Sequence, residues 1–251
     1  MIELAGLSVR YKNRDSEVLA VDNLNLKLDK GDICAVIGPS GCGKSTLLYV
    51  LSGIISEYDG KALIGGKSVN PRLHRIGLIP QNYGLLEWAD VYSNSVLGLD
   101  IKHARQKSDE AYIEYILDRL GLARLKSEYP GRLSGGQRQR VSIARSFILK
   151  PDVLLMDEPF SALDAITREE IQDLFLDIWK ENRVSTIFVT HSIEEAIYIG
   201  RKVAIMSPSP GRILKIFDNP LFGIENLRLA DEYYRFSMEI RRMVKEAWSK
   251  C

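Results

Sequence analysis

Cysteine is scarce in this 251-residue chain, and its placement excludes two common kinds of stabilising site. The three cysteines, Cys34, Cys42 and Cys251, stand apart without a CxxC or a Cys/His pattern. An odd number of separated thiols argues against both a disulfide framework and a cysteine-bound zinc site. We therefore expect a protein of the reducing cytosol.

An excess of charge of one sign is also missing. The chain has 34 Lys and Arg residues against 33 Asp and Glu residues, a formal net charge of +1. Proteins that bind polyanions usually carry a strong positive field, so nucleic acid is not an expected partner.

Long apolar runs are absent as well. No segment approaches the roughly 18 apolar residues that a membrane-spanning helix needs. The opening MIELAGLSVRY lacks the basic and apolar regions of a signal peptide. Any link to a membrane is therefore expected to go through another protein.

The composition that is present, 45% hydrophobic and 27% charged, is that of a globular protein with a substantial core. Apolar runs of strand length alternate with segments of helical period, which predicts an α/β fold. Near the start, two alternating segments predict an antiparallel β layer with one apolar face. The residues on that face are Leu7, Val9, Tyr11, Leu24, Leu26 and Leu28.

The most specific pattern follows the apolar run 33–37, which predicts a parallel strand buried on both faces. A complete GxxxxGK[ST] motif comes next, before the helical TLLYVLSG. Its residues are Gly38, Pro39, Ser40, Gly41, Cys42, Gly43, Lys44, Ser45 and Thr46. Backbone N–H groups of such a loop surround phosphate oxygens, Lys44 supplies a cation for the β- and γ-phosphates, and Ser45 is a ligand for Mg²⁺. The motif predicts ATP and Mg²⁺ binding; the alternative is a glycine-rich turn that caps a helix.

A second apolar run, 153–156, ends in Asp157 and Glu158. Carboxylates at the carboxyl end of a strand lie where open α/β sheets hold their ligands. We expect Asp157 to reach Mg²⁺ through water and Glu158 to polarise an attacking water. Such a pair alone is often a solvated turn, but the upstream phosphate loop favours the catalytic interpretation.

Two further features belong to the same pattern. The β-branched run 185–190 leads into His191, although a lone histidine is more often structural or merely exposed. The sequence Leu133-Ser134-Gly135-Gly136-Gln137 precedes a helical segment, with Ser134 as a predicted N-cap. Alone this would be a capped turn. Beside an existing phosphate loop, its exposed N–H groups suggest a nucleotide shared between two surfaces.

In this order, the phosphate loop, LSGGQ, Asp157-Glu158, SALD at 161–164 and His191 resemble the ABC ATPase family over roughly residues 1–217. The resemblance implies a RecA-like P-loop NTPase core with an antiparallel β layer and an inserted helical subdomain. We place the core at about 1–81 and 150–217, the helical subdomain at about 82–149, and a short helical tail at 218–251.

The resemblance also implies roles for single residues. Two copies would pack head to tail, with ATP between the phosphate loop of one and residues 134–137 of the other. Gln81 resembles the residue that contacts Mg²⁺ and the attacking water, and His191 the one that contacts the γ-phosphate. Asp164 resembles the residue that crosses the dimer. Tyr11 resembles the aromatic that stacks on adenine, although its alternation with Leu7 and Val9 also predicts a packed strand.

The segment after Gln81 resembles a particular branch of the family. Residues 82–88 and 207–213 resemble the corresponding segments of importers of nitrate, sulfonates and taurine. Two positions differ from that pattern: Glu87 replaces the usual proline, and Pro80 stands where an aromatic residue is common. In this branch the helical subdomain meets a transmembrane permease at the cytoplasmic face of the membrane, and an external solute-binding protein acts with the permease. We expect Leu85, Leu86 and Trp88 to face the permease; the alternative is that Trp88 packs within the insert.

Two amphipathic helices complete the prediction. The first is in the insert, with an apolar face of Ala111, Ile113, Tyr115, Ile116, Leu117 and Leu120. The second is in the tail, with an apolar face of Tyr233, Phe236, Ile240 and Met243; we expect it to pack on the core or to fray, and the alternative is a regulatory role. The alternative function is a non-transport ABC ATPase of ribosomes or chromosomes, a class that usually has two motif sets or a long coiled coil. A P-loop kinase would leave LSGGQ and SALD unexplained. The predicted function is a transport-coupled ATPase.

Overall fold

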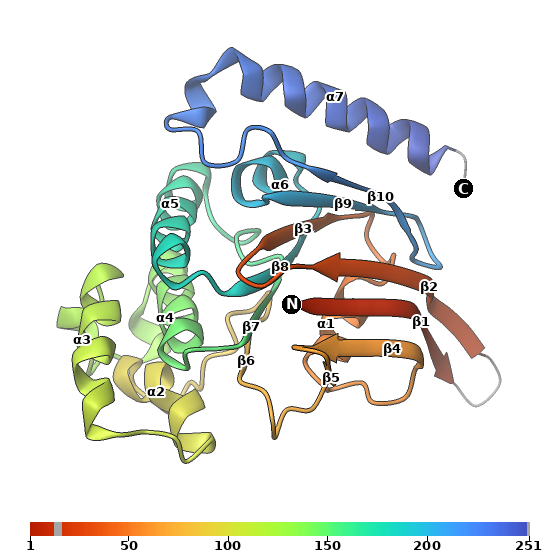
Figure 1. Ribbon diagram of the computed structural model, residues 1–251. Helices are drawn as coiled ribbons and strands as arrows, with labels where there is room; N and C mark the ends of the chain where they lie inside the picture. The colour runs from red at the N-terminus through yellow and green to blue at the C-terminus, as the bar shows by residue number, and fades with distance from the viewer. Residues whose placement is uncertain (13–16, 250–251) are drawn as a thin grey trace. The chain divides into compact units, whose positions relative to one another are not determined.

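The computed structural model describes residues 1–12 and 17–249, which form two compact units (Figure 1). The first comprises the described residues within Met1–His74 and Val184–Cys251, and the second is Arg75–Arg183. Each has its own paired strands and buried side chains. Cys251 lies outside the described residues.

An antiparallel sheet opens the first unit, as predicted. Its strands follow the order β2-β1-β4-β5: β2 (Glu17–Leu28), β1 (Ile2–Lys12), β4 (Asp59–Ile64) and β5 (Lys67–Ser68). Leu7 and Val9 are buried, and so are Leu24, Leu26 and Leu28 of β2. Tyr11 is not, because register shifts between Leu7 and Arg10 interrupt the strict alternation of the β1–β2 ladder.

A second layer of the first unit is mainly parallel. Strand β3 (Ile33–Ile37) lies between β8 (Ser185–Thr190) and β9 (Lys202–Met206), and β10 (Ile213–Asp218) pairs antiparallel with β9. Every residue of β3 is buried, which confirms the prediction for this run. Ile37 pairs with Thr190 and with Ile205, so the segments that follow these three strands leave the same edge of the sheet. Helices α1 (Lys44–Leu51) and α6 (Ile193–Ile199) begin there.

The tail packs on the first unit, as predicted. After the short 3₁₀ turn η4 (Leu227–Leu229), helix α7 (Asp231–Trp248) covers this unit, as Figure 1 shows. Tyr233 Oη donates to the carbonyl of Glu194 at 2.8 Å, and Trp248 Nε1 donates to that of Met206 at 3.0 Å. Ile240 is fully buried.

The second unit combines a parallel strand pair with helices. Strand β6 (Ile76–Ile79) pairs with β7 (Val153–Asp157). The helices are α2 (Val91–Ile101), α3 (Glu110–Arg119), α4 (Gly135–Ile148) and α5 (Ala165–Asn182), with 3₁₀ turns η1 (Lys107–Asp109), η2 (Ala123–Leu125) and η3 (Pro130–Arg132). Phe147 of α4 and Phe160 pack against Phe175 of α5, with ring centroids 5.9 and 6.3 Å apart. This aromatic cluster holds α4 and α5 together.

The apolar face of α3 is narrower than predicted. Ile113, Ile116, Leu117 and Leu120 are fully buried. The prediction was wrong for Ala111 and Tyr115, which are exposed because they lie outside the stripe of i, i+3 and i+4 positions. The Tyr115 hydroxyl instead donates to Glu181 at 2.6 Å. In the described part of the chain, no helix has the length and apolar character of a bilayer span.

Candidate nucleotide site

The loop between β3 and α1 has the backbone that a phosphate cradle requires. Gly41 and Gly43 have φ values of +76° and +97°, which other residues rarely adopt. A Cβ on Gly43 would lie only 2.7 Å from the carbonyl oxygen of Ala20, so space as well as conformation requires glycine here. The Cys42 N–H donates to the Pro39 carbonyl at 3.3 Å and closes the loop.

Lys44 lies folded over this loop. Its side chain is only 6% exposed, and Nζ donates to the carbonyls of Gly38 at 2.9 Å and Pro39 at 3.0 Å. Helix α1 begins at Lys44, its first turn contains no acidic residue, and its N-cap, Gly43, has no side chain to cap it. The ammonium group and the positive end of the helix therefore act on the same loop, which suits a bound phosphate.

Tyr11 lies beside the same helix. Its hydroxyl is 3.1 Å from Thr46 Oγ1, and 42% of the residue is exposed. The packed-strand interpretation of Tyr11 is therefore wrong. Its ring is accessible for stacking on a base, and that role stays a prediction.

His191 follows β8 at the edge where the phosphate loop follows β3. Thr190 pairs with Ile37, the last residue of β3, and the His191 side chain is exposed. The turn after it is well fixed: the Thr190 hydroxyl donates to Glu195 at 2.6 Å and accepts from the Ser192 N–H at 3.0 Å. The first unit therefore brings His191, Tyr11 and the phosphate loop to one region.

The second unit brings the other predicted catalytic residues together. Ile79 pairs with Met156, so Gln81 and the pair Asp157-Glu158 leave the same edge of the two parallel strands. Glu158 has φ +45°, and its carbonyl accepts from the Ser161 N–H and hydroxyl at 3.2 and 2.9 Å. Residues held in such left-handed conformations concentrate at functional sites.

The LSGGQ segment forms the predicted cap of α4. Ser134 Oγ accepts from the Gln137 N–H at 3.2 Å, and Gln137 Oε1 accepts from the Ser134 N–H at 2.9 Å. The hydroxyl of Ser134 keeps its own proton, which it can donate to an anion. A Cβ on Gly136 would lie 2.7 Å from Thr167 Cγ2, so this glycine allows α4 to approach α5 closely.

Asp164 has a local function that the motif did not reveal. It is the N-cap of α5, and its carboxylate accepts from the Thr167 N–H at 3.1 Å. The backbone and side-chain hydrogen bonds of Thr167 hold the pKa of Asp164 below its usual value. The signature glycine Gly136 and the cap at Asp164 thus meet on the same turn of α5.

Sequence reasoning missed the residues that hold the segment after Gln81. Arg145 of α4 donates to the carbonyls of Tyr83 at 2.8 Å and Gly84 at 2.5 Å, and Ser142 donates to that of Tyr83 at 3.0 Å. Both turn residues have left-handed φ values, +64° and +60°. We name this arrangement of Arg145 and Ser142 on the two carbonyls the α4 clamp. Nothing in the helical spacing of α4 distinguishes Arg145 from Arg138 and Arg140, so its partners could not be predicted.

Trp88, farther along this segment, is 78% exposed, so the alternative that it packs within the insert is wrong. The fully buried Asn94 fixes the neighbouring backbone. Its side chain accepts from the Leu86 N–H at 2.8 Å and donates to the carbonyls of Leu86 and Ala89 at 3.1 and 2.8 Å. The indole is therefore presented to solvent next to backbone that Asn94 holds.

The oxygen donors predicted for a metal suit Mg²⁺, which prefers hydroxyl, amide, carboxylate and water oxygens. Ser45 belongs to the first unit, and Gln81 and Asp157 belong to the second. Within residues 1–12 and 17–249, no group of three or more His, Cys, Asp or Glu side chains could hold a metal ion by itself.

A family profile described as "ABC transporter" matches residues 21–161, which include the phosphate loop, LSGGQ and Asp157-Glu158. The chain belongs to the ABC transporter family. It is 40% identical to the aliphatic sulfonates import ATP-binding protein of Bacillus cereus, over 88% of this chain and 86% of that protein. It is 39% identical to the taurine import ATP-binding protein of Ruegeria pomeroyi, over 87% and 82% of the two chains.

Solved structures of ABC cassettes share this fold. One is the dimeric post-hydrolysis state of the ATP-binding cassette MJ0796 bound to ADP and Pi. It has a TM-score of 0.76 and 28% sequence identity, and the similarity covers 87% of this chain and 98% of that cassette. The predicted P-loop fold, with an antiparallel and a parallel sheet, is confirmed.

Proposed function

We propose that this chain is the ATP-hydrolysing subunit of an ABC importer for a small solute of the sulfonate, taurine or nitrate type. The observation that carries the proposal is a complete phosphate loop, with Lys44 folded over it, in a chain that matches import ATP-binding proteins along most of their length.

In this proposal ATP binds along the first unit. Backbone N–H groups of residues 38–46 would surround its phosphates, and Lys44 would exchange its two carbonyl acceptors for phosphate oxygens. The exposed ring of Tyr11 would stack on adenine, at a position fixed by the hydrogen bond of its hydroxyl with Thr46.

Hydrolysis would be performed by residues that follow strands β6, β7 and β8. Glu158 would accept a proton from the attacking water, whose oxygen forms the new bond to the γ-phosphorus as the bond to the β,γ-bridging oxygen breaks. Gln81 would orient that water, and His191 would donate to the γ-phosphate. Mg²⁺, when bound, would neutralise phosphate charge, held by Ser45 and Gln81 directly and by Asp157 through water.

A second copy would complete each site. The N–H groups at the start of α4 and the hydroxyl of Ser134 would contact the γ-phosphate held by the partner copy, with Gly135, Gly136 and Gln137 beside it. Asp164 would face the same interface. The helical subdomain at about 82–149 would meet a transmembrane permease at the cytoplasmic face of the membrane, and an external solute-binding protein would deliver the solute.

The proposal is tested by phosphate release from purified protein and by what co-purifies with it. We expect Mg²⁺-dependent ATP hydrolysis, co-purification with a membrane permease, and solute uptake by the reconstituted complex. Absence of hydrolysis in the assembled complex would refute the enzymatic role. Co-purification with ribosomes or chromosomes, in place of a permease, would favour the non-transport class.

A further inference from the structure

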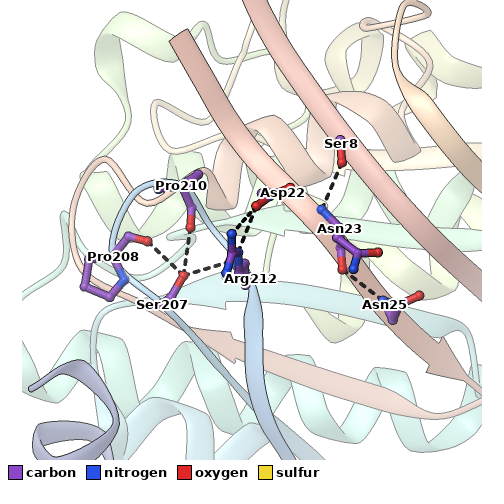
Figure 2. A network of polar contacts seen from close by, with 8 residues as sticks. All are labelled: Ser8, Asp22, Asn23, Asn25, Ser207, Pro208, Pro210 and Arg212. Carbon is purple, nitrogen blue, oxygen red and sulfur yellow. Dashed lines mark hydrogen bonds and ion pairs between the residues drawn. The ribbon is translucent and has the colours of Figure 1, made fainter. Parts of the chain in front are cut away.

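The turn from Ser207 to Arg212, between β9 and β10, has a rigid shape of its own. The Ser207 hydroxyl lies 2.8 and 2.9 Å from the carbonyl oxygens of Pro208 and Pro210, and it accepts from the Arg212 N–H at 2.8 Å. The Ser207 N–H donates to the Arg212 carbonyl at 2.8 Å. Figure 2 shows the Ser207 side chain at the centre of these contacts. The turn is therefore closed by hydrogen bonds within itself.

This turn is tied to strand β2. The Gly211 N–H donates to the Ala20 carbonyl at 2.9 Å, and its carbonyl accepts from the Asp22 N–H at 3.0 Å. Arg212 Nε donates to the Asp22 carboxylate at 2.9 Å, as Figure 2 shows. Two backbone hydrogen bonds and an ion pair thus fix the turn against the antiparallel sheet.

The turn also touches the phosphate loop. A Cβ on Gly211 would lie 2.1 Å from the backbone oxygen of Cys42 and 2.1 Å from the methyl carbon of Met206. The carbonyl oxygen of Ala20 accepts the hydrogen bond from Gly211, and the same oxygen would lie 2.7 Å from a Cβ on Gly43. Gly211 and Ala20 therefore lie directly against the Cys42–Gly43 backbone.

Space, and not conformation, requires glycine at 211. Gly211 does not have a left-handed φ, so an alanine there would meet no backbone strain. The Met206 methyl group is the end of a flexible side chain and can move aside, whereas the Cys42 carbonyl can move only with the loop. An added methyl group at 211 would therefore displace the backbone whose N–H groups form the cradle.

We propose that the turn 207–212 positions the phosphate-binding loop, and that Gly211 is the residue through which it acts. The inference rests on the proposed ATP-binding function. Gly211 touches no nucleotide in this scheme: it is a positioning residue that sets where the N–H donors near Cys42 and Gly43 point.

Gly211→Ala is the direct test, with ATP affinity measured by titration well below the melting temperature of each protein. We expect the Kd for ATP to rise at least about tenfold, the effect of misplacing one hydrogen bond to a charged group. Gly131→Ala is the matched control, because Gly131 also lacks a left-handed φ and a Cβ there would meet nothing within 4 Å. An unchanged Kd in folded Gly211→Ala would overturn the inference, whereas failure of the parent to bind ATP would refute the proposed function itself.

A double variant separates the effects of the two atoms that a Cβ at position 211 would meet, the Cys42 carbonyl oxygen and the Met206 methyl carbon. Met206→Val removes the terminal methyl group of Met206 but leaves the Cys42 carbonyl in place. Gly211→Ala combined with Met206→Val should therefore bind ATP as weakly as Gly211→Ala alone. Recovery of parental affinity would assign the conflict to the Met206 side chain, and the positioning role would be abandoned.

Hydrogen exchange on the parent protein tests the same contact without a substitution. ATP binding should slow exchange of the Gly211 and Arg212 amides, because fixing the loop also fixes the turn that touches it. The exposed Gly65-Gly66 turn between β4 and β5 serves as the control and should not change. Equal exchange at Gly211 with and without ATP would contradict the inference even if Gly211→Ala failed to fold.

Discussion

Replacing Lys44 with methionine should separate ATP binding from the stability of the free protein. The change keeps a long apolar side chain in the buried position but removes the ammonium group that contacts Gly38 and Pro39. Two carbonyls lose a donor, at a cost of about 1–3 kcal/mol, while the protein no longer has to bury a charge, which costs several kcal/mol. Because these effects oppose each other, we expect the free energy of unfolding without ATP to change by about 2 kcal/mol or less.

The loss in binding should be much clearer. A hydrogen bond to a charged group contributes about 1.5–3 kcal/mol, so the Kd for ATP should rise about 10- to 150-fold. At an ATP concentration of about 100 times the parental Kd, ATP stabilises the parent by about 2.7 kcal/mol, and a variant that binds a hundredfold more weakly by only about 0.4 kcal/mol. For a chain of this size those values correspond to rises in Tm of about 5–10 °C and about 1–2 °C.

Thermal unfolding with and without ATP measures both effects in one experiment. Lys67→Met, at an exposed lysine of β5, is the matched control and should keep the full ATP-dependent rise in Tm. The role of Lys44 would be refuted if Lys44→Met showed the same ATP-dependent rise as the parent. Lys44→Ala, which also removes the side-chain stem, should bind ATP as weakly and lose more stability without it.

Glu158→Gln should still bind ATP, but hydrolysis should stop because the amide cannot accept the proton of the attacking water. Light scattering with ATP and Mg²⁺ should then detect a stable dimer, and a monomer that hydrolyses ATP at the parental rate would rule out this assignment. Trp88→Ala should leave hydrolysis by the isolated subunit nearly unchanged and weaken assembly with the permease, because the indole is exposed and supports little of the core. Normal assembly and transport would place the contact surface elsewhere. Gly136→Ala should lower the free energy of unfolding by about 1–3 kcal/mol through its conflict with Thr167, whereas Gly135→Ala, whose Cβ would have its nearest neighbour at 3.4 Å, should cost less. Equal denaturation midpoints for these two variants would contradict the close approach of α4 and α5.

Local patterns predicted the buried strands and the caps because their causes are local. The run 33–37 is apolar at every position, and a strand covered on both faces requires this. Ser134 caps α4 through atoms only three residues apart in the chain. Such features can be recognised without knowing the rest of the fold.

Contacts between distant segments could not be predicted in this way. Tyr11 is exposed because the β1–β2 ladder shifts register, and single-residue alternation contains no sign of such a shift. The requirement for glycine at 211 comes from Cys42, which lies far away in the chain. Asp164 was predicted to act between two copies, but its hydrogen bond to the Thr167 N–H also gives it a function within one chain.

The α4 clamp has a consequence for anyone who exchanges segments between importers. Arg145 and Ser142 hold the carbonyls of Tyr83 and Gly84 through backbone atoms, so the grip depends on the path of the chain and little on which side chains follow. A chimera that takes residues 85–88 from a relative should therefore keep the turn at Tyr83 and Gly84 in place, provided that positions 142 and 145 stay serine and arginine. A graft that changes the length of the turn at 83–84 would leave the half-buried Arg145 guanidinium without these two acceptors. Loop length at this turn, more than sequence, thus limits which segments can be grafted after it.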